Sequence, residues 1–427
     1  MDVAFLHQTF SASGTISTDT RKIIPGSVFF ALRGEHFNGN EFAAEALRQG
    51  ASWAVIDDDR FAGLPRTTFV PDVLQALQEL ARYHRARFSI PFIGLTGSNG
   101  KTTSKELVNA VLSTKFRTVA TAGNLNNHIG VPLSILSVKE DTEVAIIEMG
   151  ANHVGEIALL CSIARPTHGF ITNIGKAHIG TFGGFDNIIR GKTELYQHLI
   201  STGGTAFINS ANKILSAMVG RFSNPVLYPG ASDYIHVELL KVHPYLEVRS
   251  DGGNPIHTHL TGDYNFENIA TALCIGKFFG VPADLAAGAV AAYTPSNMRS
   301  QVMKKGTNTI VLDAYNANPT SMEAAIRNLA SMPAARKVAI VGDMYELGED
   351  SDSEHRSVGS LLSVLGIDLS VVCGPNMAHA AAAFPGAIHC PDRDALIAWL
   401  KANPIHDATI LVKASRGMGL EKVVDLL

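Results

Sequence analysis

The sequence predicts an α/β protein of three domains. The chain has 427 residues, which exceeds the size of one ordinary domain. Short apolar segments alternate with stretches of helical periodicity along most of its length, and this alternation is typical of parallel strands covered by helices. We expect a small N-terminal α/β domain (1–88), a central domain with a mostly parallel sheet (89–296) and a C-terminal Rossmann-like domain (297–427).

Composition narrows the class of protein. Hydrophobic residues make up 46% of the chain and charged residues 17%, so the chain can fill sizeable cores and is not disordered. The net charge is −4 and there is no run of lysines and arginines, which argues against nucleic acid as a partner. Residues 1–8 do not resemble a signal peptide, and no apolar run is long enough to cross a membrane. The four cysteines are scattered without a C-x-x-C pair, so we expect a soluble, cytoplasmic protein without a disulfide framework.

The first domain reads as a small α/β unit. Residues 28–32 and 53–56 are predicted strands, and 41–49 and 72–87 are predicted helices. Two polar stretches, 17–21 and 33–40, lie next to strands, where open α/β sheets place their ligand loops. Taken alone, both stretches also fit ordinary turns without a function.

The central domain begins with a candidate phosphate-binding loop. Residues 90–96 read as a buried strand, Gly97-Ser98-Asn99-Gly100-Lys101-Thr102-Thr103 as a glycine-rich loop, and 104–112 as a helix. In such a loop, backbone N–H groups and the helix N-terminus face phosphate oxygens. Lys101 would reach the outer phosphates and Thr102 would bind Mg²⁺. The general motif has glycine where this chain has Leu95, so the match is incomplete.

Strand ends elsewhere in the central domain carry polar groups. Residues 144–150, 169–175 and 206–209 read as strands, and the first of them contains Glu148 near its end. A carboxylate there is well placed for Mg²⁺, and His178 would be able to join it. Equally, Glu148 fits a helix cap or a solvated turn, and His178 fits a hydrogen-bonded histidine without a metal.

The remaining segments complete the predicted fold. Residues 225–260 read as an antiparallel addition to the central sheet, and 266–279 as a helix of small residues. In the third domain, strands are expected at 309–313, 337–343, 369–374 and 408–413, with a helix at 321–330. This domain has no glycine-rich phosphate loop of its own, and a linker at 293–297 is placed to act as a hinge.

In several of its motifs the chain resembles the Mur ligases of bacterial cell-wall synthesis. The loop G-x-x-G-K-T-T without the earlier glycine is this family's own variant, which accounts for Leu95. Further matching segments occur in family order at 123–132, 148–151, 172–178, 190–194, 262–268, 313–319, 342–349 and 413–416. Two positions depart from the family pattern: Tyr264 stands where histidine is common, and Ala414 where glycine is common.

The resemblance implies roles for individual residues. It implies catalytic roles for Lys101, Glu148, His178, Lys192 and Arg299. It implies nucleotide contacts for Gly97, Ser98, Asn99, Gly100, Lys101, Thr102, Thr103, Asn268, Arg299 and Asp313. It implies substrate contacts for Thr20, Arg21, Asn38, Asn126 and Asn127. It implies ligation of two Mg²⁺ ions by Thr102, Glu148, His178 and Lys192, with Lys192 carbamylated so that it becomes an anionic oxygen donor.

The motifs at 313–319 and 342–349 are closest to the family branch that joins D-alanyl-D-alanine to UDP-N-acetylmuramoyl-tripeptide. That likeness implies an ATP-dependent amide ligase acting through an acyl phosphate, with its UDP-substrate domain at 1–88, and a monomer. A sibling ligase that adds one amino acid, or a folate polyglutamate ligase, is a less favoured alternative. An alternative of another class is a regulatory nucleotide-binding protein that catalyses no ligation, against which the retention of Lys101, Glu148, His178 and Lys192 argues.

Overall fold

The computed structural model describes residues 2–427, so Met1 of the predicted first domain lies outside the described residues. The N-terminal part forms a four-stranded parallel sheet in the order β1-β2-β5-β6 (Ile16–Ser17, Val28–Phe30, Trp53–Ile56, Thr67–Phe69). Its helices are α1 (Val3–Ser13), α2 (Ala43–Arg48) and α3 (Val73–Arg85), and a short hairpin is formed by β3 (Arg33–Gly34) and β4 (Phe37–Asn38). The sequence analysis did not predict α1. This helix has few charged residues, so no polar face distinguishes it in the sequence.

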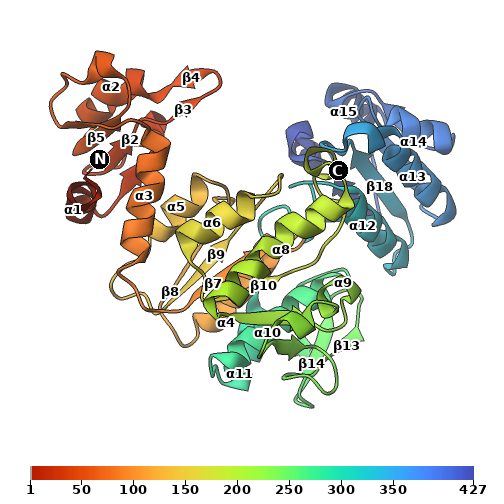
Figure 1. Ribbon diagram of the computed structural model, residues 1–427. Helices are drawn as coiled ribbons and strands as arrows, with labels where there is room; N and C mark the ends of the chain where they lie inside the picture. Colours follow the sequence, from red (N-terminus) through yellow and green to blue (C-terminus); the bar gives the residue numbers. More distant parts are fainter. Residues whose placement is uncertain (1) are drawn as a thin grey trace.

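The central part forms a six-stranded, fully parallel sheet in the order β12-β11-β10-β7-β9-β8. The strands are β7 (Phe92–Thr96), β8 (Thr118–Ala120), β9 (Val144–Glu148), β10 (His168–Ile171), β11 (Thr205–Asn209) and β12 (Val226–Tyr228). Helices α4 (Lys101–Leu112), α5 (Gly130–Leu136), α6 (Glu156–Ala164), α8 (Phe185–Thr202), α10 (Asn265–Phe278) and α11 (Ala283–Ala292) surround it, with short α7 (Ile179–Phe182) and α9 (Lys213–Ser216) between them. Figure 1 shows this part below the other two.

Residues 225–260 differ from the expectation in one respect. The segment at 226–228 is β12, which extends the main sheet in parallel. The following strands, β13 (Val237–Lys241), β14 (Glu247–Ser250) and β15 (Ile256–His257), form a separate antiparallel sheet instead of an addition to the central one. Strand periodicity alone does not reveal which sheet a strand joins, because pairing depends on long-range contacts.

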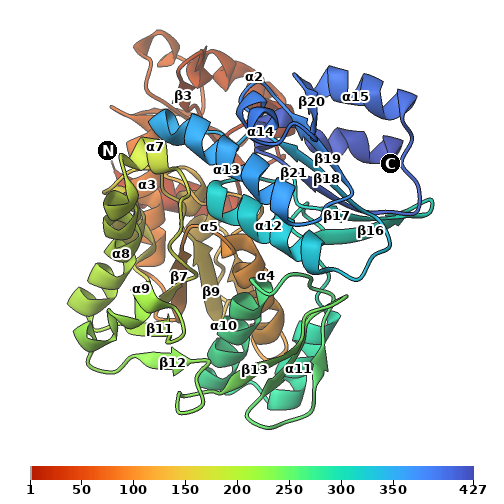
Figure 2. The same ribbon diagram turned by 90° about the vertical axis from the view of Figure 1, so that its right-hand side faces the viewer.

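The C-terminal part is a second doubly wound unit (Figure 2). Its sheet has the order β16-β17-β21-β18-β19-β20 (Gln301–Lys305, Asn308–Leu312, Thr409–Lys413, Lys337–Gly342, Leu369–Cys373, Ile388–Cys390), with only β16 antiparallel to its neighbour among the described strands. The helices are α12 (Pro319–Ser331), α13 (Ser351–Val364), α14 (Ala378–Ala383) and α15 (Arg393–Ala402). The predicted α/β class with three mostly parallel sheets is thus confirmed.

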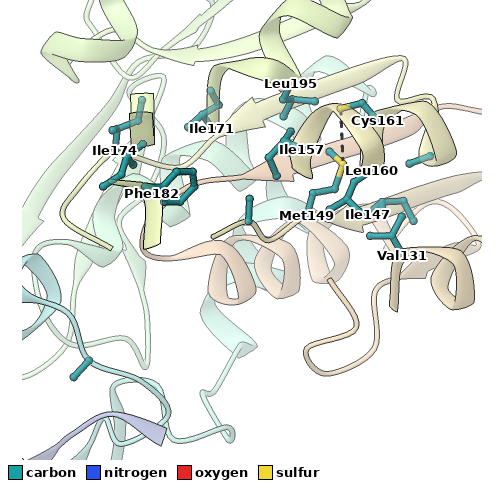
Figure 3. Packing of buried hydrophobic residues seen from close by; sticks show 14 of the residues in the cluster. Val131, Ile147, Met149, Ile157, Leu160, Cys161, Ile171, Ile174, Phe182 and Leu195 are labelled. Carbon is teal, nitrogen blue, oxygen red and sulfur yellow. Dashed lines mark hydrogen bonds between the residues drawn. The ribbon is translucent and has the colours of Figure 1, made fainter. Parts of the chain in front are cut away.

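The carboxyl edge of the central sheet is supported by a tightly packed core. Ile147 of β9 and Met149 just after it lie against Ile157 and Leu160 of α6, as Figure 3 shows. Leu195 of α8 belongs to the same cluster. This packing holds the strand ends rigidly, which a site built from several strand ends requires. Of the described helices, none is both long and apolar enough to span a bilayer.

Arg85 at the end of α3 joins the N-terminal and central parts. Its guanidinium is buried and donates to three backbone carbonyls, Ala164 O (2.8 Å), Phe88 O (2.8 Å) and Arg165 O (2.9 Å). It also lies over the Phe92 ring, 3.7 Å from its centroid. Burial lowers the pKa of Arg85 to about 10, so the group remains charged at neutral pH.

We expect Arg85→Ala to destabilise the protein by about 2–4 kcal/mol, because one buried and two part-buried carbonyls lose their donors. Urea unfolding followed by fluorescence would measure the loss. The matched control is Arg87→Ala, since Arg87 is exposed, and it should change stability by no more than about 0.5 kcal/mol. Equal stability of the two variants would contradict a joining role for Arg85.

Candidate active site

The candidate phosphate loop lies between β7 and α4. Gly97 and Gly100 have φ of +147° and +77°, in the region that favours glycine. A Cβ at Gly97 would come within 1.9 Å of Thr172 Oγ1, and one at Gly100 within 2.6 Å of Asn268 Oδ1. Both positions therefore require glycine for conformation and for space, and the loop turns tightly into the N-terminus of α4.

Lys101 is the first residue of α4, and its ammonium turns back onto the loop. Nζ donates to Gly97 O at 2.6 Å and to Ser98 O at 3.3 Å. Burial lowers the pKa of Lys101 to about 8, Glu148 acts in the opposite direction, and Arg299 lowers it further. A half-buried ammonium held only by backbone carbonyls favours the arrival of an anion.

Glu148 ends β9 beside the loop and is 1% exposed. Its Oε1 accepts from Thr102 Oγ1 (3.3 Å) and from Asn126 Nδ2 (2.8 Å). Its Oε2 is buried and has no hydrogen-bond partner among the described residues. An orphaned carboxylate oxygen beside a threonine hydroxyl is the donor set that a hard divalent cation prefers.

Lys192 lies on α8 and is 1% exposed. Its Nζ donates to Ala151 O at 2.9 Å and lies 5.1 Å from the centre of the Phe182 ring. Burial lowers the pKa of Lys192 well below its ordinary value, and the neighbouring Lys101 lowers it further. A lowered pKa increases the fraction of neutral amine, which is the form that reacts with CO₂.

Among the hydrogen bonds of the described residues, none joins His178 to Glu148. Its backbone has φ of +57°, and its Nδ1 contacts the carboxylate of Glu346 in the C-terminal part. That contact holds the pKa of Glu346 below its ordinary value. Gly180 N donates to Glu346 O (3.1 Å) and Lys176 Nζ to Glu354 Oε1 (2.6 Å), so this strand-end segment joins the two parts.

The C-terminal part adds charged groups to the same region. Asp313 follows β17; its Oδ2 accepts from the buried Lys413 Nζ (2.6 Å) and its Oδ1 from Ser300 N (3.0 Å). Arg299 lies over the Tyr315 ring, 3.6 Å from its centroid, and its buried Nε has no protein partner among the described residues. Asp313 thus pairs with a lysine, while Arg299 lies near enough to Lys101 to lower the pKa of that lysine.

Asn318 directly joins the C-terminal part to the phosphate loop. Its Nδ2 donates to Asn99 Oδ1 at 2.8 Å, and its Oδ1 accepts from Ser321 N as the cap of α12. The backbone of Asn99 is held from the other side, because Asn99 N donates to Asn173 Oδ1 (3.0 Å) and Thr172 Oγ1 donates to Asn99 O (2.6 Å). The sequence analysis did not assign Asn318 a role. An asparagine before a proline that starts a helix predicts a helix cap, and it does not predict a hydrogen bond to a distant loop.

The other predicted residues of the loop support it. Ser98 is buried and its Oγ donates to Gly175 O at 2.9 Å. Asn268 on α10 is buried, accepts from Ser104 Oγ (2.8 Å) and donates to Asn265 Oδ1 (2.9 Å). Thr103 is buried within α4. Asn127 Oδ1 accepts from Gly130 N at 2.9 Å near the start of α5.

The predicted residues of the N-terminal part lie along one edge of its parallel sheet. Thr20 and Arg21 follow β1, and Arg21 pairs with Asp19 at 2.7 Å on the surface. Asn38 ends the β3–β4 hairpin and its Nδ2 donates to Asp58 Oδ2 at 3.1 Å. In Figure 1 this hairpin stands at the top left, away from the C-terminal part.

The structure therefore joins Thr102, Glu148 and Asn126 by hydrogen bonds. Arg299 lies close enough to lower the pKa of Lys101, and Lys101 close enough to lower that of Lys192. His178 and Asp313 are engaged by Glu346 and Lys413 instead. Thr20, Arg21 and Asn38 form a second polar region on another domain.

Three segments of the chain match Mur ligase domains: the family's catalytic domain at residues 14–85, its middle domain at 95–276, and the glutamate ligase domain at 298–416. UDP-N-acetylmuramoyl-tripeptide--D-alanyl-D-alanine ligase of Escherichia coli is 36% identical over 425 residues, covering 96% of this chain and 93% of that protein.

Two solved structures share the whole architecture. The MurF ligase of Thermotoga maritima in complex with ADP has a TM-score of 0.86 and 28% identity, covering 100% of this chain and 98% of that one. The UDP-N-acetylmuramoylalanyl-D-glutamyl-2,6-diaminopimelate--D-alanyl-D-alanyl ligase of Acinetobacter baumannii has a TM-score of 0.82 and 28% identity, covering 97% and 96%. The chain belongs to the Mur ligase family.

Proposed function

We propose that this protein is an ATP-dependent amide ligase that joins D-alanyl-D-alanine to UDP-N-acetylmuramoyl-tripeptide. The product is the UDP-N-acetylmuramoyl-pentapeptide precursor of peptidoglycan. The observation that carries the proposal is the glycine loop with its half-buried Lys101 beside the buried Glu148, in a chain similar to ligases of that name along 96% of its length. The UDP-linked and ATP substrates place the reaction in the cytoplasm, and the protein acts as a monomer.

The chemistry needs activation of a carboxylate. A carboxylate oxygen of the tripeptide attacks the γ-phosphorus of ATP, the bond to the bridging oxygen breaks, and ADP leaves. The amine of D-alanyl-D-alanine then attacks the acyl carbon of the acyl phosphate, the C–O bond to phosphate breaks, and the amine loses a proton. Phosphate is a far better leaving group than oxide, which is why the nucleotide is required.

Two anions must meet in the first step, so cations must offset their repulsion. Lys101 releases its carbonyl contacts to bind the outer phosphates, which raises its proton affinity again. Arg299, held flat by Tyr315, approaches the transferring phosphoryl group. The loop residues Gly97 to Thr103 supply backbone N–H groups, Asn268 lies on the base side, and Asp313 takes part from the C-terminal domain.

The residues present fit Mg²⁺. Thr102 and Glu148 would hold one ion, and the unpartnered Glu148 Oε2 supplies an available anionic oxygen. Carbamylated Lys192 and His178 would hold the second, with His178 using Nε2 because its Nδ1 contacts Glu346. Bound Mg²⁺ neutralises phosphate charge. Among residues 2–427 no group of three or more His, Cys, Asp and Glu side chains is arranged to hold a metal ion.

Substrate placement follows from the division of the chain. Thr20, Arg21 and Asn38 in the domain at 1–88 hold the UDP portion, while Asn126 and Asn127 in the domain at 89–296 meet the peptide. The domain at 297–427 brings the amine substrate. The linker at 293–297 acts as the hinge; Tyr293 and Asn297 both donate to Glu106, at 2.5 and 3.0 Å, and anchor its two ends.

Mass analysis of the product tests the reaction. With UDP-tripeptide, ATP and D-alanyl-D-alanine, we expect one UDP-pentapeptide, one ADP and one phosphate per turnover. Turnover with a single amino acid but not with D-alanyl-D-alanine would identify a sibling ligase. Binding of ATP without ADP formation with any UDP-muramoyl acceptor would identify a regulatory protein.

Carbamylation of Lys192 is testable by NMR with ¹³C-bicarbonate. We expect a carbamate signal in the native protein that disappears in Lys192→Met, together with a fall in kcat of about 100-fold or more as a metal ligand is lost. Removal of CO₂ should lower activity, more so at lower pH because protonation removes the reactive amine. The control Lys213→Met changes an exposed helical lysine and should keep both signal and rate.

A double-mutant cycle tests the bond between Asn318 and Asn99. Asn318→Ser keeps a good helix cap but is too short to reach Asn99, and Asn99→Ala removes the other partner. Each should lower kcat/KM about 5- to 10-fold, with a coupling energy of about 1 kcal/mol in the double variant. Glu323→Ala, an exposed change on the same helix, should have no coupling to Asn99. Strict additivity of the first pair would refute the link.

A further inference from the structure

The contact between Tyr264 and Ser300 joins two domains beside the candidate active site, and the mechanism has not used it so far. The Tyr264 hydroxyl lies 2.9 Å from Ser300 Oγ, within hydrogen-bond distance. Tyr264 directly precedes α10 in the central domain, and Ser300 directly precedes β16 in the C-terminal domain. Tyr264 is also one of the two positions at which the chain departs from the family pattern.

The tyrosine ring is fixed on the central domain. Gly262 lies against it with φ of +84°, and a Cβ at this glycine would come within 2.8 Å of the Tyr264 hydroxyl oxygen. The glycine therefore leaves the space that the ring fills. Helix α10, which begins one residue after the tyrosine, is bonded to α4, because Ser104 Oγ donates to Asn268 Oδ1 at 2.8 Å. The hydroxyl is thus attached to the same rigid support as the phosphate loop.

On the other side of this bond, residues 298–300 form a strained segment that carries Arg299. Met298 and Ser300 have φ of +57° and +51°, a left-handed conformation that is unfavourable for residues other than glycine. Such a conformation persists only where the surrounding structure holds it. The backbone of Arg299 lies between the two strained positions, so its direction depends on the contacts that hold them.

Both domains hold Ser300. Its N–H donates to Asp313 Oδ1 at 3.0 Å, inside the C-terminal domain. Among the side-chain hydrogen bonds that the described residues 298–300 make, only the bond to Tyr264 reaches the central domain. Ser300 is 6% exposed, and its Oγ has no second hydrogen-bond partner in the part of the chain that the structure describes. Loss of the tyrosine hydroxyl would therefore leave a buried polar atom unpaired.

The side chain of Arg299 is held by stacking. Its guanidinium lies over the Tyr315 ring, and its buried Nε has no partner among the described residues. Tyr315 N donates to Met298 O at 3.2 Å, so the ring and the strained segment are joined. The position of the guanidinium therefore follows from this ring and from the backbone that carries it.

We propose that Tyr264 is a positioning residue, which directs Arg299 toward the transferring phosphoryl group by fixing Ser300 from the central domain. This inference rests on the proposed function, in which Arg299 offsets phosphate charge. In this role Tyr264 acts only through Ser300 and Arg299. An arginine that stabilises the transition state affects the rate more than it affects substrate binding, so loss of the tyrosine hydroxyl should appear in kcat.

Tyr264→Phe removes the hydroxyl and keeps the ring. With UDP-tripeptide, ATP and D-alanyl-D-alanine, we expect kcat to fall about 5- to 10-fold while KM for ATP changes less than about 2-fold. Ser300→Ala removes the other partner and should give a similar fall in kcat. The double variant should be no slower than either single variant, because the two changes break the same bond. Additive losses, or a rise in KM for ATP at unchanged kcat, would overturn the inference.

A second cycle tests whether the hydroxyl acts through Arg299. In the Arg299→Ala background, Tyr264→Phe should lower kcat by less than about 2-fold further, since the group that it positions is absent. A radiolabelled UDP-tripeptide makes the slow variants measurable. If Tyr264→Phe causes its full loss of kcat in this background as well, the hydroxyl acts by another route, such as Asp313, and the inference is wrong.

Tyr228→Phe is the matched control. Tyr228 is 1% exposed in the core of the central domain, and its hydroxyl accepts from Thr271 Oγ1 of α10 at 2.8 Å. This change also removes a buried hydroxyl bonded to α10 or to its neighbour, but it should leave kcat within about 2-fold of wild type. An equal fall in kcat for the two phenylalanine variants would mean that kcat responds to loosening of α10 in general, which contradicts a specific role for Tyr264.

The outcomes separate this inference from the proposed function. A wild-type kcat in Tyr264→Phe would overturn the inference and leave the ligase activity intact. Failure of the wild-type protein to form any UDP-pentapeptide, despite ATP binding, would overturn the proposed function itself. The first result is measured in the variant and the second in the wild-type protein, so the two cannot be confused.

Discussion

The structure depends most on the burial of positive charge at the carboxyl edge of the central sheet. Lys192 is buried and Lys101 half-buried, each with a lowered pKa, and Arg299 lies near enough to affect Lys101. Glu148 is the acidic group that acts on Lys101. Glu156 and Glu194 are the acidic groups that act on Lys192. Withdrawing an ammonium group from water is costly unless an anion arrives, so the two lysines favour the binding of an anion at this edge.

The C-terminal domain also contacts this edge of the central sheet. The C-terminal domain meets the phosphate loop through Asn318 and Asn99, and meets the segment after β10 through Glu346 and Glu354. His178 is therefore engaged at the domain interface in this arrangement. The contact uses Nδ1 of His178, so a metal ion would be ligated through Nε2 while Glu346 holds the ring. Domain movement and metal binding would thus be linked through one histidine.

Much of the fold was predictable from local patterns. The strands β7, β9, β11, β17, β18, β19 and β21 are strongly apolar and were all expected, as were α3, α4, α10 and α12. The short strands β8 and β12 and the helix α1 were missed, because three-residue strands carry little periodicity and α1 has few charges to mark its exposed face. The separate sheet of β13 to β15 was assigned to the wrong neighbour, since pairing is a long-range property.

The sequence by itself determined the phosphate loop, the strand-end carboxylate Glu148 and the order of the family's motifs, because these depend on residue types at fixed spacing. Only the tertiary structure decided the partners: Asn318 with Asn99, Glu346 with His178, Lys413 with Asp313. These pairs are separated by 100 residues or more, so no local pattern contains them. No local pattern predicts the small hollow between Asn127, Gly150 and Leu160 either, because its walls come from three separate segments. Its shape arises only when the strands bring those segments to one edge of the sheet.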